Sequence, residues 1–354
     1  MCIRDRNVDE EGKPLRTIRW DNGVIVTVDQ TLLPRKLKFI RLKNPREVVK
    51  ALRTMKIRGA PVIGAAAALA LAQVAYKLRN RPREKILEAL YRAARMVREA
   101  RPTAVNLFNA VDYVLREAEN CPEEENFAQY VVDKCLEYVE EDARRNRLLS
   151  IEGAKLISPK DRILTHCNAG ELATVEYGTA LGVIREAYLQ GKNVSVLATE
   201  TRPLLQGARL TAFELKRLGI PFKLITDNMV GYVMYRGLVD KVIVGADRIL
   251  ASGHVINKIG TYTIAVLAQR HGIPFYVAAP TTTFDLETPL EKVIIEERSP
   301  REVLEVQGVR IAPRGVEVLN PAFDITPPEL VSAIITEKGI IQAKPEKIRG
   351  LLEG

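Results

Sequence analysis

Between Pro159 and Pro280 the sequence alternates between short runs rich in β-branched residues and segments long enough for a helix. The short runs are Arg162–Thr165, Val194–Ala198, Lys223–Thr226, Lys241–Val244 and Phe275–Ala278. Strands that alternate with helices form a parallel sheet with right-handed crossovers and helices on both faces. The C-terminal part is therefore predicted to be a Rossmann-like, doubly wound α/β domain.

The N-terminal part has a different pattern. The β-prone runs Thr17–Trp20 and Val24–Val28 flank Asp21–Gly23, whose small polar residues tolerate the positive φ of a hairpin turn. From Asn44 and Pro45, which form a helix cap, apolar residues recur three and four positions apart. We expect a small β ribbon, then a helix from this cap and further helices over 61–79, 83–100, 103–119 and 123–148.

The length of 354 residues exceeds what one hydrophobic core usually serves, so two domains are expected. The change of period near Pro159 separates a mainly helical domain over residues 1–150 from the α/β domain over residues 151–354. Residues 1–6 contain neither an apolar segment nor a small-residue cleavage site. We expect no secretory leader there, and we expect these six residues to lie outside the native fold.

The net charge of +9 is unevenly distributed: residues 1–100 carry 23 basic and 10 acidic side chains, so they hold +13 and the remainder −4. A basic half indicates an anionic partner, which can be nucleic acid, a membrane surface or a phosphorylated small molecule. No basic run is interleaved with aromatic residues, which disfavours nucleic acid.

The apolar run Val62–Ala72 is shorter than the roughly 20 residues that a bilayer span requires, so it predicts a buried helix and no membrane anchor. The cysteines Cys2, Cys121, Cys135 and Cys167 show no paired CxxC spacing and no histidine cluster. A zinc site and a disulfide framework are therefore disfavoured, and a reducing cytoplasm fits best.

Polar residues follow every predicted strand. In an open parallel sheet, ligands bind beyond the carboxyl ends of the strands. Each of these segments alone also fits an ordinary turn, but their coincidence at one edge favours a binding site. They are His166–Gly170, Thr199–Arg202, Asp227–Asn228, Gly245–Arg248 and Thr281–Thr283.

Cys167 follows a predicted strand and precedes a glycine turn that opens a helix near Glu171. A helix N-terminus lowers a thiol pKa, so Cys167 is a candidate acid, base or nucleophile; the alternative is a small buried apolar residue, which suits Cys121 and Cys135 better. His166 either orients this cysteine or fills the sheet edge.

Asp247 leaves another predicted strand behind Gly245 and Ala246, where partial desolvation raises a carboxyl pKa towards the working range of an acid. The alternative is an ion pair with Arg248. A cysteine and an aspartate without an obvious histidine partner fit proton transfer on a sugar better than Cys-His hydrolysis.

A phosphate site is indicated by Arg58–Pro61, which opens the alanine-rich helix and brings a guanidinium, a glycine backbone and a helix N-terminus together. Arg101 and Lys258 are candidate cations for the same phosphate. Neither a GxxxxGK[ST] loop nor a GxGxxG fingerprint is present, which favours a small phosphate ester over a nucleotide.

Taken together, these segments resemble the methylthioribose-1-phosphate isomerase family, which is related to the regulatory subunits of the translation factor eIF2B. The resemblance runs from about Trp20 to Gly339. It rests on Arg58–Pro61, Arg101–Leu107, Thr165–Gly170, Glu200–Pro203, Gln206–Arg209, Gly245–Arg248, Asn257–Tyr262 and Asn320–Asp324.

The resemblance implies an aldose–ketose isomerase of methionine salvage that converts 5-methylthio-α-D-ribose 1-phosphate to 5-methylthio-D-ribulose 1-phosphate. It implies a cytoplasmic homodimer without metal or organic cofactor. It also implies that Cys167 and Asp247 are the catalytic pair. The residues implied to hold the substrate are Arg58, Gly59, Ala60, Arg101, Gln206, Asn257 and Lys258.

The chain departs from the family pattern at Thr199 and His254, where aspartates are expected. Two other substrates therefore stay open, because relatives that isomerise ribose 1,5-bisphosphate or 5-deoxyribose 1-phosphate share the cysteine and the aspartate. Arg101–Leu107 and Asn320–Asp324 favour the methylthioribose enzyme. The alternative from another class of function is a non-enzymatic regulator that resembles eIF2B. Such a regulator does not require an acidic side chain that faces a thiol.

Overall fold

The structure is a computed structural model that describes residues 14–101 and 104–353. Cys2, Pro102 and Thr103, and the expectations for residues 1–6, lie outside the described residues. The chain separates into two compact units. The N-terminal unit comprises Met1–Arg147 and Gly170–Gly178, and the C-terminal unit comprises Leu148–Ala169 and Thr179–Gly354. The division at residue 150 stays a prediction about domain limits.

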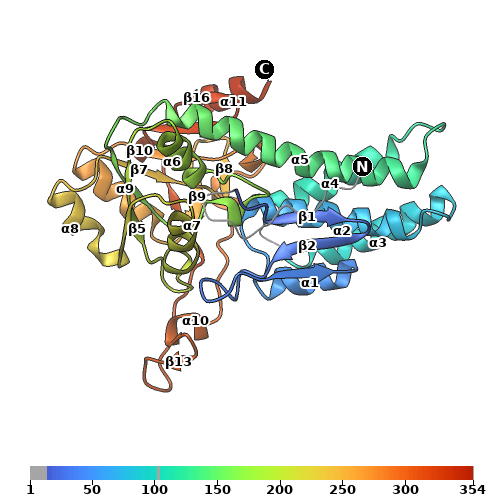
Figure 1. Ribbon diagram of the computed structural model, residues 1–354, viewed down its shortest axis with the longest axis horizontal. Helices are drawn as coiled ribbons and strands as arrows, with labels where there is room; N and C mark the ends of the chain where they lie inside the picture. Colours follow the sequence, from blue (N-terminus) through green and yellow to red (C-terminus); the bar gives the residue numbers. More distant parts are fainter. Residues whose placement is uncertain (1–13, 102–103, 354) are drawn as a thin grey trace. The chain divides into compact units, whose positions relative to one another are not determined.

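The C-terminal unit contains, within the described residues, a sheet of seven strands in the order β16-β15-β10-β7-β4-β5-β6 (Figure 1). All neighbours are parallel except the antiparallel edge strand β16. The parallel part follows the Rossmann order 3-2-1-4-5-6, so the predicted fold class is confirmed. The strands are β4 (Arg162–Thr165), β5 (Ser195–Thr199), β6 (Phe222–Ile225), β7 (Lys241–Val244), β10 (Phe275–Ala278), β15 (Ala333–Thr336) and β16 (Gly339–Ile341).

Helices cover both faces of this sheet, as side chains that alternate along the strands show. Leu164 and Val242 lie in one apolar cluster with α8, α9 and α11, whereas Ile163 and Ile243 lie in another with α6, α7 and the end of α5. The sheet is thus doubly wound. The helices of the two faces are α6 (Ala180–Leu189), α7 (Ala212–Arg217), α8 (Val230–Tyr235), α9 (Thr261–Arg270) and α11 (Pro345–Glu353), whereas α10 (Arg301–Leu304) contributes to neither cluster.

The strands β4 and β7 lie side by side at the point where the strand order reverses. Crossovers from β4 and from β7 leave in opposite directions along the sheet, so a crevice forms between their carboxyl ends. Cys167 follows β4 and Asp247 follows β7, so the predicted catalytic pair leaves the sheet at this switch point.

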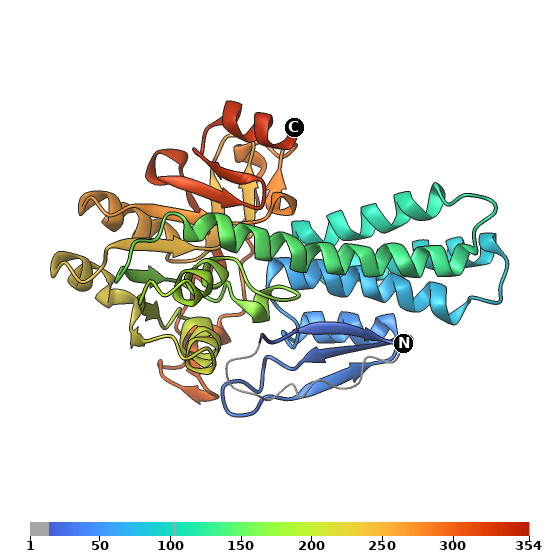
Figure 2. The ribbon, with the colours of Figure 1, turned by 45° about the horizontal axis from the view of Figure 1, so that its top comes forward.

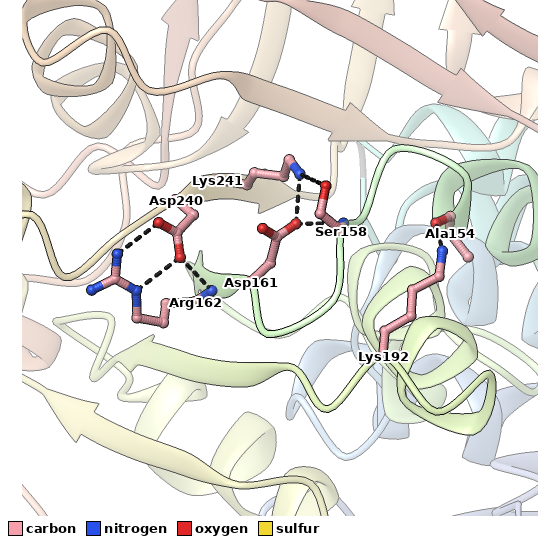
Figure 3. Close-up of polar contacts among 7 residues, drawn as sticks. All are labelled: Ala154, Ser158, Asp161, Arg162, Lys192, Asp240 and Lys241. Carbon is pink, nitrogen blue, oxygen red and sulfur yellow. Dashed lines mark hydrogen bonds and ion pairs between the residues drawn. The ribbon is translucent and has the colours of Figure 1, made fainter.

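Reciprocal ion pairs join the amino ends of the same two strands (Figure 3). Arg162 makes a two-pronged contact with Asp240, at 2.6 and 2.8 Å, and Lys241 Nζ lies 2.5 Å from Asp161 Oδ2. Each strand therefore starts with an aspartate and a cation that pair with the opposite charges of its neighbour. The hydrogen bonds from Arg162 also hold the pKa of Asp240 below its ordinary value.

A second sheet of the C-terminal unit, in the order β11-β8-β9-β14, was not predicted. Its strands are two to four residues long, and β9 pairs with β14 from more than 60 positions away, so no local periodicity marks them. They are β8 (Arg248–Leu250), β9 (Val255–Lys258), β11 (Phe284–Asp285) and β14 (Phe323–Thr326), with β12 (Glu305–Val306) and β13 (Val309–Arg310) as a separate antiparallel pair.

The N-terminal unit combines an antiparallel ribbon with helices (Figure 2). The predicted hairpin is present and gains a third strand, β3, which pairs with β2. Asn44 caps the first helix through a 3.1 Å hydrogen bond from the Glu47 backbone, as predicted. The elements are β1 (Ile18–Asp21), β2 (Val24–Val28), β3 (Phe39–Leu42), α1 (Pro45–Arg53), α2 (Ala60–Lys77), α3 (Arg83–Arg98), α4 (Val105–Glu119) and α5 (Phe127–Ala154), which continues into the C-terminal unit.

Helix α2 is the central element of the N-terminal unit. Of the described helices, it is the one that is long and apolar enough to cross a bilayer, but 72% of its apolar window is buried inside the structure. Its apolar side chains pack with those of α1, α3 and α4 in one cluster. The run Val62–Ala72 therefore forms a buried core helix, as expected.

The segment after Cys167 corrects one expectation. Within the described chain, Glu171–Ala173 is a single 3-10 turn, η1, and the next regular helix, α6, begins only at Ala180. Glu171 instead serves the ribbon of the N-terminal unit, where its carboxylate accepts the Leu15 backbone N–H at 3.0 Å. The helix predicted to open near Glu171 therefore does not begin there.

Gly245 permits close contact between the loops that follow β4 and β7. A Cβ atom built on Gly245 would lie 2.9 Å from the Cβ of Ala169 and 3.4 Å from Thr179 Oγ1. We expect Gly245→Ala to lower the free energy of unfolding by about 1–3 kcal/mol, the usual effect of overpacking, in urea denaturation. Gly350→Ala, where no atom lies within 4 Å, is the control. Equal midpoints for Gly245→Ala and the wild type would contradict this contact.

Candidate active site

Cys167 has a backbone conformation that few residues other than glycine adopt. Its φ is 63°, in the left-handed region. Hydroxyl groups hold both of its peptide groups: the Cys167 N–H donates to Thr201 Oγ1 at 2.8 Å, and the Cys167 carbonyl accepts from Thr211 Oγ1 at 2.6 Å. Such strain persists only where the surroundings fix it. The backbone from which the half-buried thiol projects is therefore fixed at the end of β4.

Thr201 is strained in the same way, although it is β-branched. Its φ is also 63°. The carboxylate of Asp227, which follows β6, accepts the backbone N–H groups of Thr201 and Arg202 at 2.8 and 2.7 Å. Burial, and next the charge of Asp227, raise the pKa of the nearby Glu200 carboxyl. The loops after β4, β5 and β6 thus form one hydrogen-bonded assembly.

His166 is buried immediately before Cys167 and uses both ring nitrogens. Nδ1 lies 2.6 Å from Thr199 Oγ1, and Nε2 lies 2.9 Å from the Ile259 carbonyl oxygen. Burial lowers the pKa of His166 below its ordinary value. The imidazole is therefore neutral near pH 7.

Asp247 is half-buried beyond the end of β7. Its backbone N–H donates to the Ile256 carbonyl at 3.0 Å, which joins this loop to β9 of the second sheet. The neighbouring Arg248 forms an ion pair with Asp285, at 3.6 Å. The second sheet therefore fixes the backbone from which the Asp247 side chain projects.

Lys258 and Asn257 end strand β9, and both are buried. Lys258 Nζ donates to the Ala322 carbonyl at 2.7 Å and lies 4.8 Å from the centre of the Phe323 ring. Asn257 Nδ2 donates to Thr261 Oγ1 at 3.0 Å. A buried ammonium held by a carbonyl and an aromatic ring is suited to an anionic group.

Gln206 is buried at the start of the π-helical turn η2 (Gly207–Thr211). Its Oε1 has no hydrogen-bond partner among the described residues, which suits a ligand donor such as a hydroxyl. A Cβ on Gly207 would lie 1.7 Å from the Thr199 carbonyl oxygen. This glycine therefore lets η2 approach the end of β5 and also places Thr211 beside Cys167.

The predicted phosphate residues of the N-terminal unit lie around the start of α2. Arg58 is buried, and Gly59, with a φ of 107°, caps the helix that Ala60 begins. Arg101 is half-buried and reaches Met55 Sδ at 3.0 Å, three positions before Arg58. Both predicted cations of this unit therefore lie along the segment that leads into α2.

The sequence patterns predicted no role for several residues that shape this site, although Thr201 and Asp227 belong to strand-end segments expected near it. Thr201, Thr211 and Asp227 act through contacts with distant segments, which no local pattern shows. Asp324 belongs to a segment noted for its resemblance, but no role was predicted for it. Its Oδ2 accepts the Gly260 N–H at 2.7 Å at the start of α9, and its Oδ1 is buried without a hydrogen-bond partner in the described chain.

No group of three or more His, Cys, Asp or Glu side chains in the described part of the chain is placed to hold a metal ion. Cys121 and Cys135 are buried, and burial raises the pKa of both thiols. They fit the predicted role of small apolar residues, although Cys121 lies just beyond α4 and not within a helix. Cys167 differs from them in exposure and in backbone conformation.

Asp324 gives stability a specific pH dependence. Burial raises the pKa of its carboxyl from 3.8 to about 6, against the opposing effect of the backbone N–H groups of Gly260 and Tyr262. Between these pH values the folded chain keeps a proton that the unfolded chain loses, so stability falls as the pH rises from about 4 to about 6. We expect Asp324→Asn to abolish this fall, which amounts to about 2–3 kcal/mol.

Urea denaturation of both proteins from pH 4 to pH 7 measures the difference. Asp240→Asn is a control of opposite sign, because hydrogen bonds from Arg162 lower the pKa of Asp240. Loss of the Asp240 carboxylate lowers the free energy of unfolding above pH 4, and this loss of stability disappears as the pH falls. Parallel pH curves for the wild type and Asp324→Asn would contradict the role of burial.

Comparison with known proteins places this chain among two related groups. The model of the Initiation factor 2 subunit family matches residues 56–343. A methylthioribose-1-phosphate isomerase of Acetivibrio thermocellus is 50% identical over 331 residues, covering 92% of this chain and 96% of the relative. One from Dehalococcoides mccartyi is 47% identical over 329 residues, covering 93% and 98%.

Solved structures agree with this placement. The 5-methylthioribose 1-phosphate isomerase of Pyrococcus horikoshii has a TM-score of 0.90 at 41% identity, covering 100% of this chain and 99% of that one. A protein of A. fulgidus described as the delta subunit of translation initiation factor eIF-2B has a TM-score of 0.84 at 47% identity, covering 96% and 100%. The chain belongs to the Initiation factor 2 subunit family and, within it, to the methylthioribose-1-phosphate isomerases.

Proposed function

We propose that this protein is an aldose–ketose isomerase that converts 5-methylthioribose 1-phosphate to 5-methylthioribulose 1-phosphate in methionine salvage. Relatives about 50% identical over nine-tenths of the chain carry that name. The observation that most supports a catalytic role is the switch point, where a strained, hydroxyl-clamped Cys167 and Asp247 leave adjacent strands. Residues held in such conformations cluster at active sites.

The substrate explains why an acid is needed. Its anomeric oxygen carries the phosphate, so the furanose ring cannot open as a free sugar does. We assign Asp247 as the acid that protonates the ring oxygen while the bond between C1 and that oxygen breaks. Opening leaves an electron-deficient C1, which receives the hydrogen from C2. The C2 hydroxyl then loses its proton and becomes the ketone, which replaces the proton given by Asp247.

Cys167 serves the transfer of hydrogen from C2 to C1, by one of two routes. In the first, its thiolate removes the C2 proton, an enol forms between C1 and C2, and a proton returns to C1. In the second, the hydrogen moves directly from C2 to C1 as a hydride, and Cys167 stabilises the transition state. Both routes leave the same atoms and electrons in the product.

The substrate-binding residues implied by the resemblance are proposed for each unit by itself. Lys258, Asn257 and Gln206 serve from the C-terminal unit, where the first is a buried ammonium and the last has an unpaired oxygen. The N-terminal unit contributes Arg58, Gly59 and Ala60 at the start of α2, where free N–H groups and the helix dipole favour anions, together with Arg101.

The remaining assignments are also proposals. We propose a homodimer that acts in the cytoplasm on a small sugar phosphate, without a metal, an organic cofactor, nucleic acid or a membrane as partner. The basic surplus of residues 1–100 is then mostly surface charge, because the phosphate requires few cations.

A regulatory role is the second candidate, because a solved relative 47% identical to this chain is described as an eIF-2B subunit. One assay separates the candidates. We expect kcat/KM for ketose formation to be highest with 5-methylthioribose 1-phosphate, and lower with ribose 1,5-bisphosphate and 5-deoxyribose 1-phosphate. A reversed order would reassign the substrate, and no turnover of any of the three would favour the regulator.

Substitution of the two assigned catalytic groups tests their roles. We expect Cys167→Ser and Asp247→Asn each to lower kcat by roughly 10²–10⁴-fold, the usual effect of losing a general acid or base. Cys121→Ala and Asp112→Asn are the matched controls, since Cys121 is a buried thiol and Asp112 an exposed surface carboxylate. Circular dichroism confirms folding. Near-normal turnover of either active-site variant removes that residue from the mechanism.

Substrate labelled with deuterium at C2 distinguishes the two routes of hydrogen transfer. If the thiolate removes a proton, solvent hydrogen appears at C1 of the product. If the hydrogen moves as a hydride, all of the deuterium is retained at C1.

A further inference from the structure

We propose that His166 is a positioning residue that joins the Cys167 loop to the Lys258 loop through its neutral imidazole. Its two ring nitrogens serve different loops: Nδ1 leads to the cysteine, and Nε2 leads to the segment that follows the lysine. The proposal rests on the proposed function, because it assigns the Nδ1 side of His166 to the chemical step and the Nε2 side to phosphate binding. We call the Nδ1 side the cysteine arm and the Nε2 side the second arm.

The chemistry of the partner groups sets the direction of the hydrogen bonds that His166 makes. The Ile259 carbonyl only accepts, so His166 Nε2 carries the proton. Nδ1 of the neutral ring is then an acceptor, and it takes the hydroxyl proton of Thr199 across 2.6 Å. Thr201 Oγ1 lies 3.2 Å from Thr199 Oγ1 and 3.4 Å from the Thr199 carbonyl oxygen, and its hydroxyl can donate to either.

The last bond of the series reaches the cysteine. Having donated to Thr199, Thr201 Oγ1 accepts the backbone N–H of Cys167 at 2.8 Å. Thr199 and Thr201 are completely buried, so water does not replace a lost partner. Through Thr199, His166 therefore helps to position the Thr201 hydroxyl that accepts the N–H of the left-handed peptide of Cys167.

The second arm fixes the loop between β9 and α9. Ile259 lies directly after Lys258, and its carbonyl accepts from His166. The next residue, Gly260, has a φ of 100°, and a Cβ there would lie 3.2 Å from Cε1 and Nε2 of the imidazole. Asp324 holds the Gly260 N–H from the other side. The imidazole and this carboxylate thus clamp the peptide that follows the buried ammonium.

The Thr199 hydroxyl allows the His166 imidazole to stay neutral. The family pattern led us to expect an aspartate here, and a carboxylate beside Nδ1 would favour the imidazolium form. In this chain the group beside Nδ1 is a hydroxyl, while the charged groups that influence His166 are Asp227 and Lys258. These have opposite signs and opposite effects on the ring, so burial keeps it neutral.

Two substitutions separate the arms. In His166→Asn, the side-chain amide replaces Nδ1 and keeps an acceptor for Thr199, but the bond to Ile259 is lost. We expect KM to rise about 10-fold with kcat nearly unchanged. In His166→Gln, the amide reaches the position of Nε2 and keeps the bond to Ile259, while Thr199 loses its acceptor. We expect kcat to fall about 10-fold or more with KM nearly unchanged.

Thr199 provides a check on the cysteine arm. Thr199→Val removes the hydroxyl at nearly constant shape and should reproduce the loss of kcat, whereas Thr199→Ser keeps the hydroxyl and should restore it. His271 is exposed at the end of α9, so His271→Asn and His271→Gln are the matched controls and should leave kcat and KM unchanged. Thermal unfolding shows that each variant is folded at the assay temperature.

The rate of alkylation of Cys167 by iodoacetamide, followed by mass spectrometry of its peptide, requires no turnover. We expect it to change in His166→Gln and Thr199→Val, but not in His166→Asn or Thr199→Ser. Equal changes of kcat and KM in both His166 variants, or an alkylation rate that is the same in all variants, overturn the inference. A wild type that turns over no sugar phosphate but shows the expected alkylation pattern overturns the proposed function and leaves the link between His166 and Cys167 supported.

Discussion

The pairing of β4 with β7 is the constraint on which the C-terminal unit depends. These two parallel strands lie where the strand order reverses, so their connections leave in opposite directions and their carboxyl ends stay uncovered. At the amino ends, reciprocal ion pairs join each strand to its neighbour and so help to fix the register. Register and topology together bring the loops of Cys167 and Asp247 next to each other.

The parallel strands could be predicted because burial on both faces makes them short apolar runs bounded by polar turns. Three of the five predicted runs match strands in both bounds, and Val194–Ala198 and Lys223–Thr226 are displaced by one residue. The second sheet could not be predicted, because its pairings, such as that of β9 with β14, join segments far apart in the sequence. The helix predicted to open near Glu171 was wrong for a related reason. An acidic side chain is typical of a first helical turn, yet the Glu171 carboxylate accepts a hydrogen bond from the distant Leu15.

The catalytic candidates were predictable to the extent that a strand end shows where a side chain can meet a ligand. Cys167 and Asp247 meet this criterion, whereas Gln206 and Asn257 were reached through family resemblance alone. No role was predicted for Thr201 and Thr211, because a threonine becomes a clamp only when tertiary structure brings its hydroxyl to a particular peptide. The left-handed φ of Cys167 likewise has no sequence signal, since glycine is the residue that usually adopts it.

The polar groups around Cys167 and those near Lys258 differ in kind. Around Cys167 the partners are threonine hydroxyls, peptide groups and, through Thr199, a neutral imidazole. Near Lys258 they are a buried ammonium, an aromatic ring and the partly buried carboxylate of Asp324. A phosphate requires fixed positive charge, whereas hydrogen transfer between neighbouring carbons requires a thiol held in one direction. Because His166 contacts the Thr199 hydroxyl with one ring nitrogen and the Ile259 carbonyl with the other, it can align the two groups.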